Sequence, residues 1–323
     1  MKHLTNVFSG NNQWWRYLVL FLASFLGGQT IGGIPLLLVI VFKMAQSGGS
    51  IQPNPENMAD LSVYGIDSNF GLFLMLLPFI VSFFILLVLY KPLHRRNYKI
   101  ILTGSTSIRW SRFFMAAIIW ASLSGIYLFT DYLKDPANYT FNFNPESFIV
   151  LLLVSIVLIP FQASFEEAMF RGYLAQGVGV LTKSRLLVIL IPSLLFGLMH
   201  SFNPEVAEYG FWIVMPQYIL FGLLFGIITV LDDGIELAMG AHSANNIFLS
   251  VFLTSKASSL QTQALLTQHK INAVADLISL SIISVLFIVI LYFIYNWKFV
   301  ILATKIENQV VESESTDPEK IYL

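Results

Sequence analysis

Long apolar runs constrain this chain more than any other feature, because few folds can bury them. A helix rises about 1.5 Å per residue, so roughly 20 apolar residues cross a bilayer core of about 30 Å. About eight stretches approach or exceed that length, near residues 16–43, 69–90, 112–130, 146–170, 184–201, 208–231, 235–254 and 273–303. We therefore predict an all-α fold, a polytopic membrane helix bundle with about eight transmembrane helices.

Composition agrees with a membrane protein and excludes several other classes. Charged residues make up 11% of the chain and apolar residues 56%, whereas soluble domains carry about 25% charged residues. The chain has no cysteine, which excludes disulfides and thiol chemistry. Its net charge is −1 and no basic stripe suggests nucleic acid, so we expect no nucleic-acid partner. The expected partner is the lipid bilayer.

The positions of Lys and Arg predict the orientation in the membrane. The loop at 91–112 is rich in both, whereas the loops at 44–68 and 131–147 are mainly acidic. Because cytoplasmic loops carry the excess of basic residues, we expect both termini in the cytoplasm. Asp232 and Asp233, in a later inner loop, run against this pattern. No second domain is visible, so we expect one membrane domain over 1–323, ending in a polar tail at 304–323.

Ionisable residues inside the apolar runs are the informative ones. They lie in "EEAMFR" (166–171), "FGLMH" (196–200) and "HSANN" (242–246). A charge in the bilayer costs about 2.5–3.5 kcal/mol on insertion scales, so such groups face a cavity or a partner. Taken singly, each could be an interhelical link or a side chain reaching the interface. Three clusters on three helices favour a functional site.

Spacing separates the two glutamates of the first cluster. Glu167 and Arg171 are four residues apart and can pair, while Glu166 points about 100° away from Glu167. Glu166 is therefore the candidate general base. Glu166 and His200 each lie about 17 residues from the turn near residue 183, roughly 25 Å above it.

The third cluster begins with His242. His242 and Asn246 share one helix face because they are four residues apart. His242 lies some nine residues past the Asp232–Asp233 turn, or roughly 14 Å above it. The turn near residue 183 could extend further into the cytoplasm, which would bring His242 level with Glu166 and His200.

The three clusters resemble the Glu-Glu-x-x-x-Arg, Phe-x-x-x-His and His-x-x-x-Asn motifs of a family of intramembrane proteases. This is the CAAX-processing endopeptidase and bacteriocin-processing family, also called CPBP or Abi. The resemblance covers a catalytic core at about 145–255. It implies that Glu166 activates a water with His200, that Glu167 and Arg171 support that helix, and that His242 and Asn246 steady the oxyanion.

The resemblance also implies a membrane-associated protein or peptide as substrate, prenylated or not. We expect a multi-pass protein of the bacterial cytoplasmic membrane. The chemistry is coherent without the family, because Glu, His and Asn can supply a base, donors for an oxyanion and a proton for the leaving amine. Neither a His-Glu-x-x-His nor a Gly-x-Ser-x-Gly motif is present.

Three alternatives stay open at the level of sequence. Glu166, His200 and His242 could bind zinc, although the favoured mechanism requires no cofactor. A family member could bind a membrane partner in the same cavity without cutting it. A secondary transporter would also hold Glu and His at mid-depth, but we would then expect interrupted segments in two repeated halves.

Overall fold

The computed structural model describes residues 2–48 and 61–307, and within them it confirms an all-α bundle. Most of the expected tail lies outside the described residues. Among the described residues, six helices are long and apolar enough to span a membrane: α2 (Trp14–Gln46), α3 (Ser68–His94), α5 (Trp110–Lys134), α6 with its continuation (Pro145–Thr182), α10 (Phe211–Asp232) and α12 (Ala273–Tyr295). The other two expected spans are shorter helices, α8 (Arg185–Met199) and α11 (Glu236–Val251).

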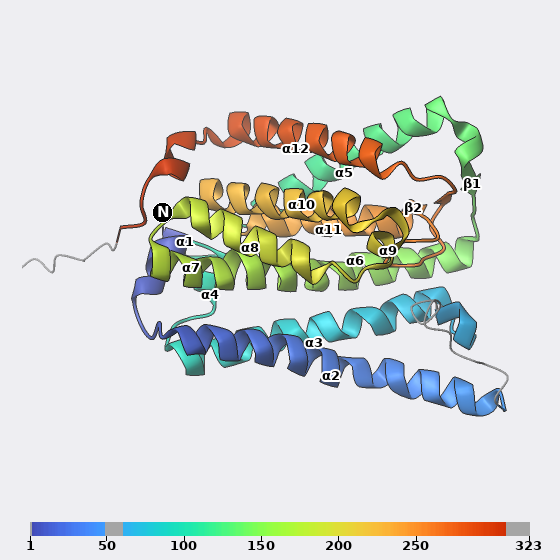
Figure 1. Cartoon of the computed structure of the whole chain (residues 1–323), viewed down its shortest axis with the longest axis horizontal. Helices are drawn as coiled ribbons and strands as arrows, with labels where there is room; N and C mark the ends of the chain where they lie inside the picture. Colours follow the sequence, from blue (N-terminus) through green and yellow to red (C-terminus); the bar gives the residue numbers. More distant parts are fainter. Residues whose placement is uncertain (1, 49–60, 308–323) are drawn as a thin grey trace, which may run out of the picture.

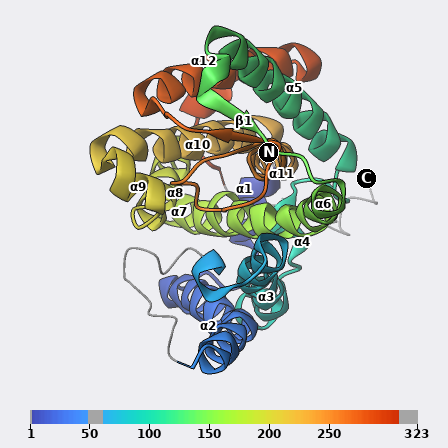
Figure 2. The same cartoon turned by 90° about the vertical axis from the view of Figure 1, so that its right-hand side faces the viewer.

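The helices form layers around α6 (Figures 1 and 2). The hairpin of α2 and α3 lies on one side, where α3 packs against α6. On the other side α11 packs against both α6 and α5, α8 packs against α10, and α12 covers α5 and α10. The contact between α6 and α11 therefore lies inside the bundle, while the opposite face of α6, with Leu153 and Val157, is exposed.

Close helix contacts depend on glycine at two crossings. A Cβ on Gly32 of α2 would lie 2.5 Å from the Pro78 Cα, and one on Gly222 of α10 would lie 2.8 Å from the Ser193 Cα. Real Cβ atoms do not approach backbone that closely, so a larger residue would push the helices apart. Small residues serve this purpose in membrane helix pairs.

Helix α6 (Pro145–Glu167) begins within one residue of the apolar run predicted near residue 146 and continues beyond Glu167 without a loop. Asn144 accepts a hydrogen bond from the Ser147 amide at 3.1 Å, and Pro145 occupies the first position, where no N–H is needed. The helix then continues through a π-helical segment, η5 (Ala168–Leu174), into α7 (Ala175–Thr182). Such π segments are rare and occur frequently at functional sites.

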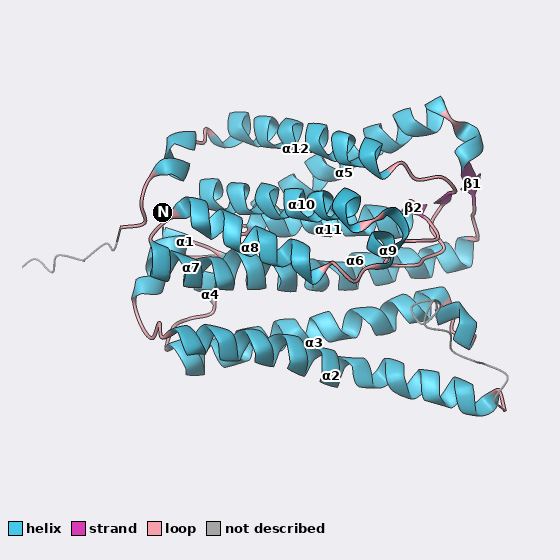
Figure 3. Cartoon of the chain, in the orientation of Figure 1, coloured by secondary structure: helices cyan, strands magenta, loops and turns pink. Residues whose placement is uncertain are grey.

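Short elements close the two ends of the bundle. One end of the bundle carries a small sheet, magenta in Figure 3. Its strands are β1 (Tyr139–Phe141), β3 (Leu266–Gln268) and β2 (Leu253–Thr254), in the order β1-β3-β2. β1 pairs with β3 in antiparallel register, and β2 with β3 in parallel. The remaining short elements are α1 (Lys2–Thr5), η1 (Asn6–Phe8), η3 (Leu61–Tyr64), α4 (Lys99–Leu102), η4 (Pro136–Asn138), α9 (Pro204–Tyr209) and η6 (Phe299–Ala303).

The basic loop and the α10–α11 turn lie at the same end of the molecule. Gly104 N donates to Asp233 O at 2.8 Å. Asp232 pairs with Arg109 at 3.0 Å and with Arg112 at 3.4 Å, which explains the acidic residues in a basic region. Burial acts to lower the pKa of Arg109, but the hydrogen bond with Glu236 and the charges of Asp232 and Glu236 outweigh it and hold that pKa above its ordinary value.

The first and last described segments of the chain lie at this end of the molecule (Figure 1). The backbone amides of Lys2 and His3 donate to the Asp233 carboxylate, each at 2.8 Å, and Ile306 N donates to Lys183 O at 2.9 Å. His3 is fully buried, and this burial lowers its pKa despite the nearby Asp233 charge. Residues 2–3 and 306 therefore lie at the same end of the bundle as the basic loop.

We predict that cysteines introduced one at a time by Ser105→Cys and Ala137→Cys are labelled from opposite sides of the membrane. Both residues are exposed, Ser105 in the basic loop and Ala137 at the sheet end. An impermeant maleimide added to intact cells should label only the Ala137→Cys protein, and disrupted membranes should give both. Labelling of Ser105→Cys in intact cells would contradict the orientation. Ser50, an alternative outer position, lies outside the described residues.

Candidate active site

The two adjacent glutamates and the arginine of the first motif are buried together. Glu166, Glu167 and Arg171 are 6%, 0% and 1% exposed. Arg171 Nη1 donates to Glu167 Oε1 at 2.9 Å, which is the expected pair at four-residue spacing. The pair spans the junction between α6 and the π-helical η5, so the irregular backbone lies directly beside the charged groups.

Helix α11 brings His242 onto both glutamates. Its Nδ1 lies 2.7 Å from Glu167 Oε1, and its Nε2 lies 3.6 Å from Glu166 Oε2. A carboxylate can only accept, so Nδ1 carries a proton and donates to Glu167. Glu167 therefore fixes the ring orientation of His242 and directs Nε2 toward Glu166. Its role includes orienting the imidazole as well as pairing with Arg171.

Gln162, which the sequence analysis did not single out, connects Asn246 to Glu166 by hydrogen bonds. Asn246 Nδ2 donates to Gln162 Oε1 at 2.9 Å, and Gln162 Nε2 donates to Glu166 Oε1 at 2.6 Å. Gln162 stands one helical turn before Glu166 in an otherwise apolar run, a spacing that could have drawn attention to it. Glu166 Oε2 is buried and has no hydrogen-bond partner among the described residues.

His200 lies beside this cluster and belongs to a second polar group. Its Nδ1 donates to Phe196 O at 2.7 Å, and its ring stacks on Tyr218 with centroids 4.4 Å apart. A carbonyl only accepts, so the neutral ring keeps Nε2 as an acceptor. No hydrogen bond or ion pair joins His200 to Glu166 in the described part of the chain. Phe196 links the clusters, since its ring contacts His200 and lies 6.1 Å from that of His242.

Tyr218 and Glu205 are further residues of this second group that the sequence did not reveal. Asn203 Nδ2 donates to the Tyr218 hydroxyl at 2.8 Å, and that hydroxyl donates to Glu205 Oε1. Ser259 Oγ donates to the other carboxylate oxygen of Glu205 at 2.6 Å. The Tyr218 ring is thereby held in place against His200.

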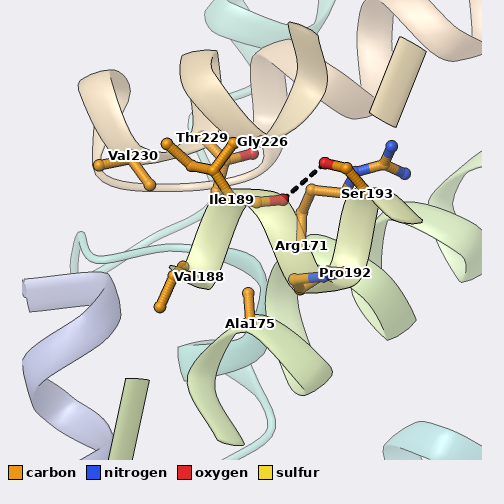
Figure 4. Close-up of a pocket in the computed structure, with 9 residues that line it drawn as sticks. All are labelled: Arg171, Ala175, Val188, Ile189, Pro192, Ser193, Gly226, Thr229 and Val230. Carbon is orange, nitrogen blue, oxygen red and sulfur yellow. Dashed lines mark hydrogen bonds between the residues drawn. The ribbon is translucent and has the colours of Figure 1, made fainter. Parts of the chain in front are cut away.

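The Arg171 guanidinium lies in an aromatic environment. It is 4.3 Å from the Phe196 ring centroid and 5.4 Å from that of Phe225, favourable positions for a cation over π faces. Toward α8 and α10, Arg171 and Thr229 border a cavity of about 10 Å³, roughly the space of one water (Figure 4). The surroundings of Arg171 are therefore largely apolar, which strengthens its attraction to Glu167.

Comparisons with known proteins agree with this geometry. The family model "Type II CAAX prenyl endopeptidase Rce1-like" matches residues 145–248. "Uncharacterized protein YyaK" of Bacillus subtilis (strain 168) is 31% identical over 259 residues, which cover 80% of this chain and 84% of that protein. The chain belongs to the Rce1-like family. No solved structure matches the chain significantly.

The Rce1-like match contains all three motifs of the site, from Glu166 to Asn246. It confirms the family that those motifs suggested. It also confirms the broad class, a family of multi-pass membrane endopeptidases. Helices α2, α3 and α5 precede the matched residues.

The three zinc ligands that the sequence suggested, Glu166, His200 and His242, are not arranged around a common metal position. Among residues 2–48 and 61–307, no group of three His, Cys, Asp or Glu side chains is arranged to hold a metal ion. Glu166 and His242 are close together, but His200 bonds to Phe196 O and stacks on Tyr218. The donor set does not fit a metal in this arrangement.

Proposed function

We propose that the chain is an intramembrane endopeptidase that hydrolyses a peptide bond of a membrane-associated substrate with a water activated by Glu166. The observation that carries the proposal is one buried cluster in which His242 contacts both Glu166 and Glu167, although 75 residues separate His242 from Glu167. Packing alone would favour apolar residues here, because buried charges are costly in a membrane.

Charge balance suggests the protonation state in which the cluster acts. Glu166, Glu167 and Arg171 together carry a formal charge of −1, and an imidazolium at His242 neutralises it. Because Nδ1 already donates to Glu167, His242 can donate from Nε2 only as this imidazolium. We therefore assign His242 as a charged oxyanion donor, together with the Asn246 N–H that Gln162 does not use.

In the proposed reaction, Glu166 carries one proton from the attacking water to the leaving amine. Glu166 takes a proton from water while the water oxygen bonds to the peptide carbon, and the carbonyl oxygen gains negative charge beside His242 and Asn246. The C–N bond breaks as Glu166 returns the proton to the leaving amine. His200, with Nε2 as an acceptor, orients the same water.

The substrate class follows from the family and from the location of the site. The family model names a CAAX prenyl endopeptidase, so we propose a membrane-associated protein or peptide, with prenylated proteins included. The relative in Bacillus subtilis supports a bacterial cytoplasmic membrane as the location. Many apolar side chains of α2 and α12 face outward, where lipid and substrate would approach.

We predict that His242→Gln and Asn246→Ala each lower kcat by about 10²–10³ without abolishing turnover, as for other oxyanion donors. Chelation should not change wild-type activity, and elemental analysis of active protein should show no stoichiometric zinc. His269→Gln, at the exposed histidine near β3, is the matched control and should behave as wild type. Stoichiometric zinc, with activity lost on chelation and restored by zinc, would overturn the metal-free mechanism.

A further inference from the structure

A chain of amide hydrogen bonds crosses three helices and ends on Glu166. It begins at Trp120 of α5, passes through Asn245 and Asn246 of α11, and reaches Gln162 of α6. The donor–acceptor distances are 3.2 Å from Trp120 to Asn245, 3.0 Å from Asn245 to Asn246, 2.9 Å from Asn246 to Gln162 and 2.6 Å from Gln162 to Glu166. We call these four donors the amide relay.

The direction of the amide relay is fixed at both ends. The indole N–H of Trp120 can only donate, and the ionised carboxylate of Glu166 can only accept. Each amide in between must therefore accept on the Trp120 side and donate on the Glu166 side. No side-chain flip of Asn245, Asn246 or Gln162 preserves all four bonds. Aligned bonds of this kind polarise one another and strengthen the last one.

The bond from Gln162 to Glu166 occupies Oε1, so Oε2 is the oxygen of Glu166 that can take a proton from water. Gln162 is 7% exposed and uses both ends of its amide, with Oε1 on Asn246 and Nε2 on Glu166 Oε1. That bond holds Glu166 Oε1, while Oε2 lies 3.6 Å from His242 Nε2. The same amide also holds Asn246, the proposed oxyanion donor.

We propose that Gln162 is a positioning residue of the peptidase reaction, which holds the base Glu166 and the donor Asn246 in one fixed geometry. The inference rests on the proposed function, since it assigns Glu166 as the base. A packing role alone would not require glutamine at this position. Burying an amide costs free energy, and an apolar side chain of similar volume would fill the same space without that cost. Gln162 touches Glu166 and Asn246, and it acts on the reaction through them.

The test is Gln162→Met in the full-length protein, reconstituted with a substrate that the wild type cleaves. We expect kcat to fall by about 10²-fold, as for a misplaced catalytic group, with KM within about twofold. The acidic limb of the kcat/KM profile should move to higher pH, because a donor that favours the charged carboxylate is lost. Among the described residues, the other ionisable groups at this site are Glu167, Arg171 and His242, together with His200, which orients the same water in the proposed reaction. This substitution leaves all four in place.

Gln162→Glu is the second variant, in case the first fails to fold. It keeps the shape but places a carboxylate beside Glu166, so the acidic limb should move in the same direction, and further. Gln176→Met is the matched control, because Gln176 is also buried. Among the described residues, its amide donates to the backbone carbonyls of His3 and Ile100 and to no residue of the site. This substitution should lower thermal stability and leave the pH profile unchanged.

The outcomes separate this inference from the function on which it rests. If the folded Gln162 variants keep wild-type kcat and the wild-type acidic limb while Glu166→Gln is inactive, the positioning role is wrong and the base assignment stands. If Glu166→Gln is itself active, the proposed function fails first. A loss of stability in the Gln162 variants, with an unshifted pH profile like that of Gln176→Met, would also overturn the positioning role.

Discussion

Glu166→Gln is expected to abolish peptide cleavage, with a loss of about 10⁴-fold, while the protein folds normally in detergent. The substitution removes the group that takes the proton from water. It keeps the size of the side chain, and its Oε1 can still accept the hydrogen bond from Gln162. The measurement is kcat of purified protein, with size-exclusion chromatography and thermal melting to verify folding.

Glu146→Gln provides the control for that experiment. Glu146 lies in the first turn of the same helix, is exposed, and undergoes the same chemical change. It should retain wild-type turnover. Near-wild-type turnover by Glu166→Gln would instead contradict its assignment as the base, and comparable losses in both variants would indicate a non-specific effect.

The second large effect is expected from Arg171→Met, which should destabilise the fold by about 3–5 kcal/mol. It removes the cation from a pair whose side chains are 1% and 0% exposed and leaves the buried Glu167 with His242 Nδ1 but without its arginine. Chemical denaturation or thermal melting in detergent measures the change. The double variant Arg171→Met with Glu167→Gln should recover much of the loss, because no unpaired charge then remains.

A stable Arg171→Met protein would show that the stability of buried Glu167 does not depend on Arg171. A double variant destabilised by as much as the sum of the two single variants, or by more, would show that the two residues do not act as a pair. The double variant should still be slow as an enzyme, since Glu167 also fixes His242 Nδ1.

Relations within one helix could be predicted from the sequence, because four-residue spacing determines a shared face. The Glu167–Arg171 pair and the separate direction of Glu166 are of this kind. Contacts between helices could not be predicted, since they depend on how α11 is rotated against α6. The Glu167–His242 and Gln162–Asn246 bonds are therefore findings of the structure.

The structure also shows why Glu166 and His242 meet although the sequence estimates placed them at different heights. Gln176 donates to His3 O, and His3 N donates to Asp233, so the α10–α11 turn lies level with Gln176 and not with Lys183. Glu166 is about 15 Å from that level along its helix, and His242 is about 14 Å. As the sequence analysis allowed, the turn near residue 183 extends further along the bundle axis.

Elements without periodicity could not be predicted. The strands of the small sheet contain two or three residues each, too few for an alternating pattern. The acidic residues of the inner loop suggested an exception to the charge rule, but Asp232 is paired with basic residues of the neighbouring loop. The position of His200 against Tyr218 depends on the contact of α8 with α10 and has no local signal.

The most direct test of the central claim is cleavage in H₂¹⁸O. Membranes containing either the wild type or Glu166→Gln at equal expression are incubated in labelled water, and new peptide C-termini are identified by mass spectrometry. Our account predicts a set of membrane-associated proteins or peptides with ¹⁸O in newly formed C-terminal carboxylates in the wild-type sample, and none of them in the Glu166→Gln sample. The same labelled C-termini in both samples, or none in either, would contradict hydrolysis by a water that Glu166 activates.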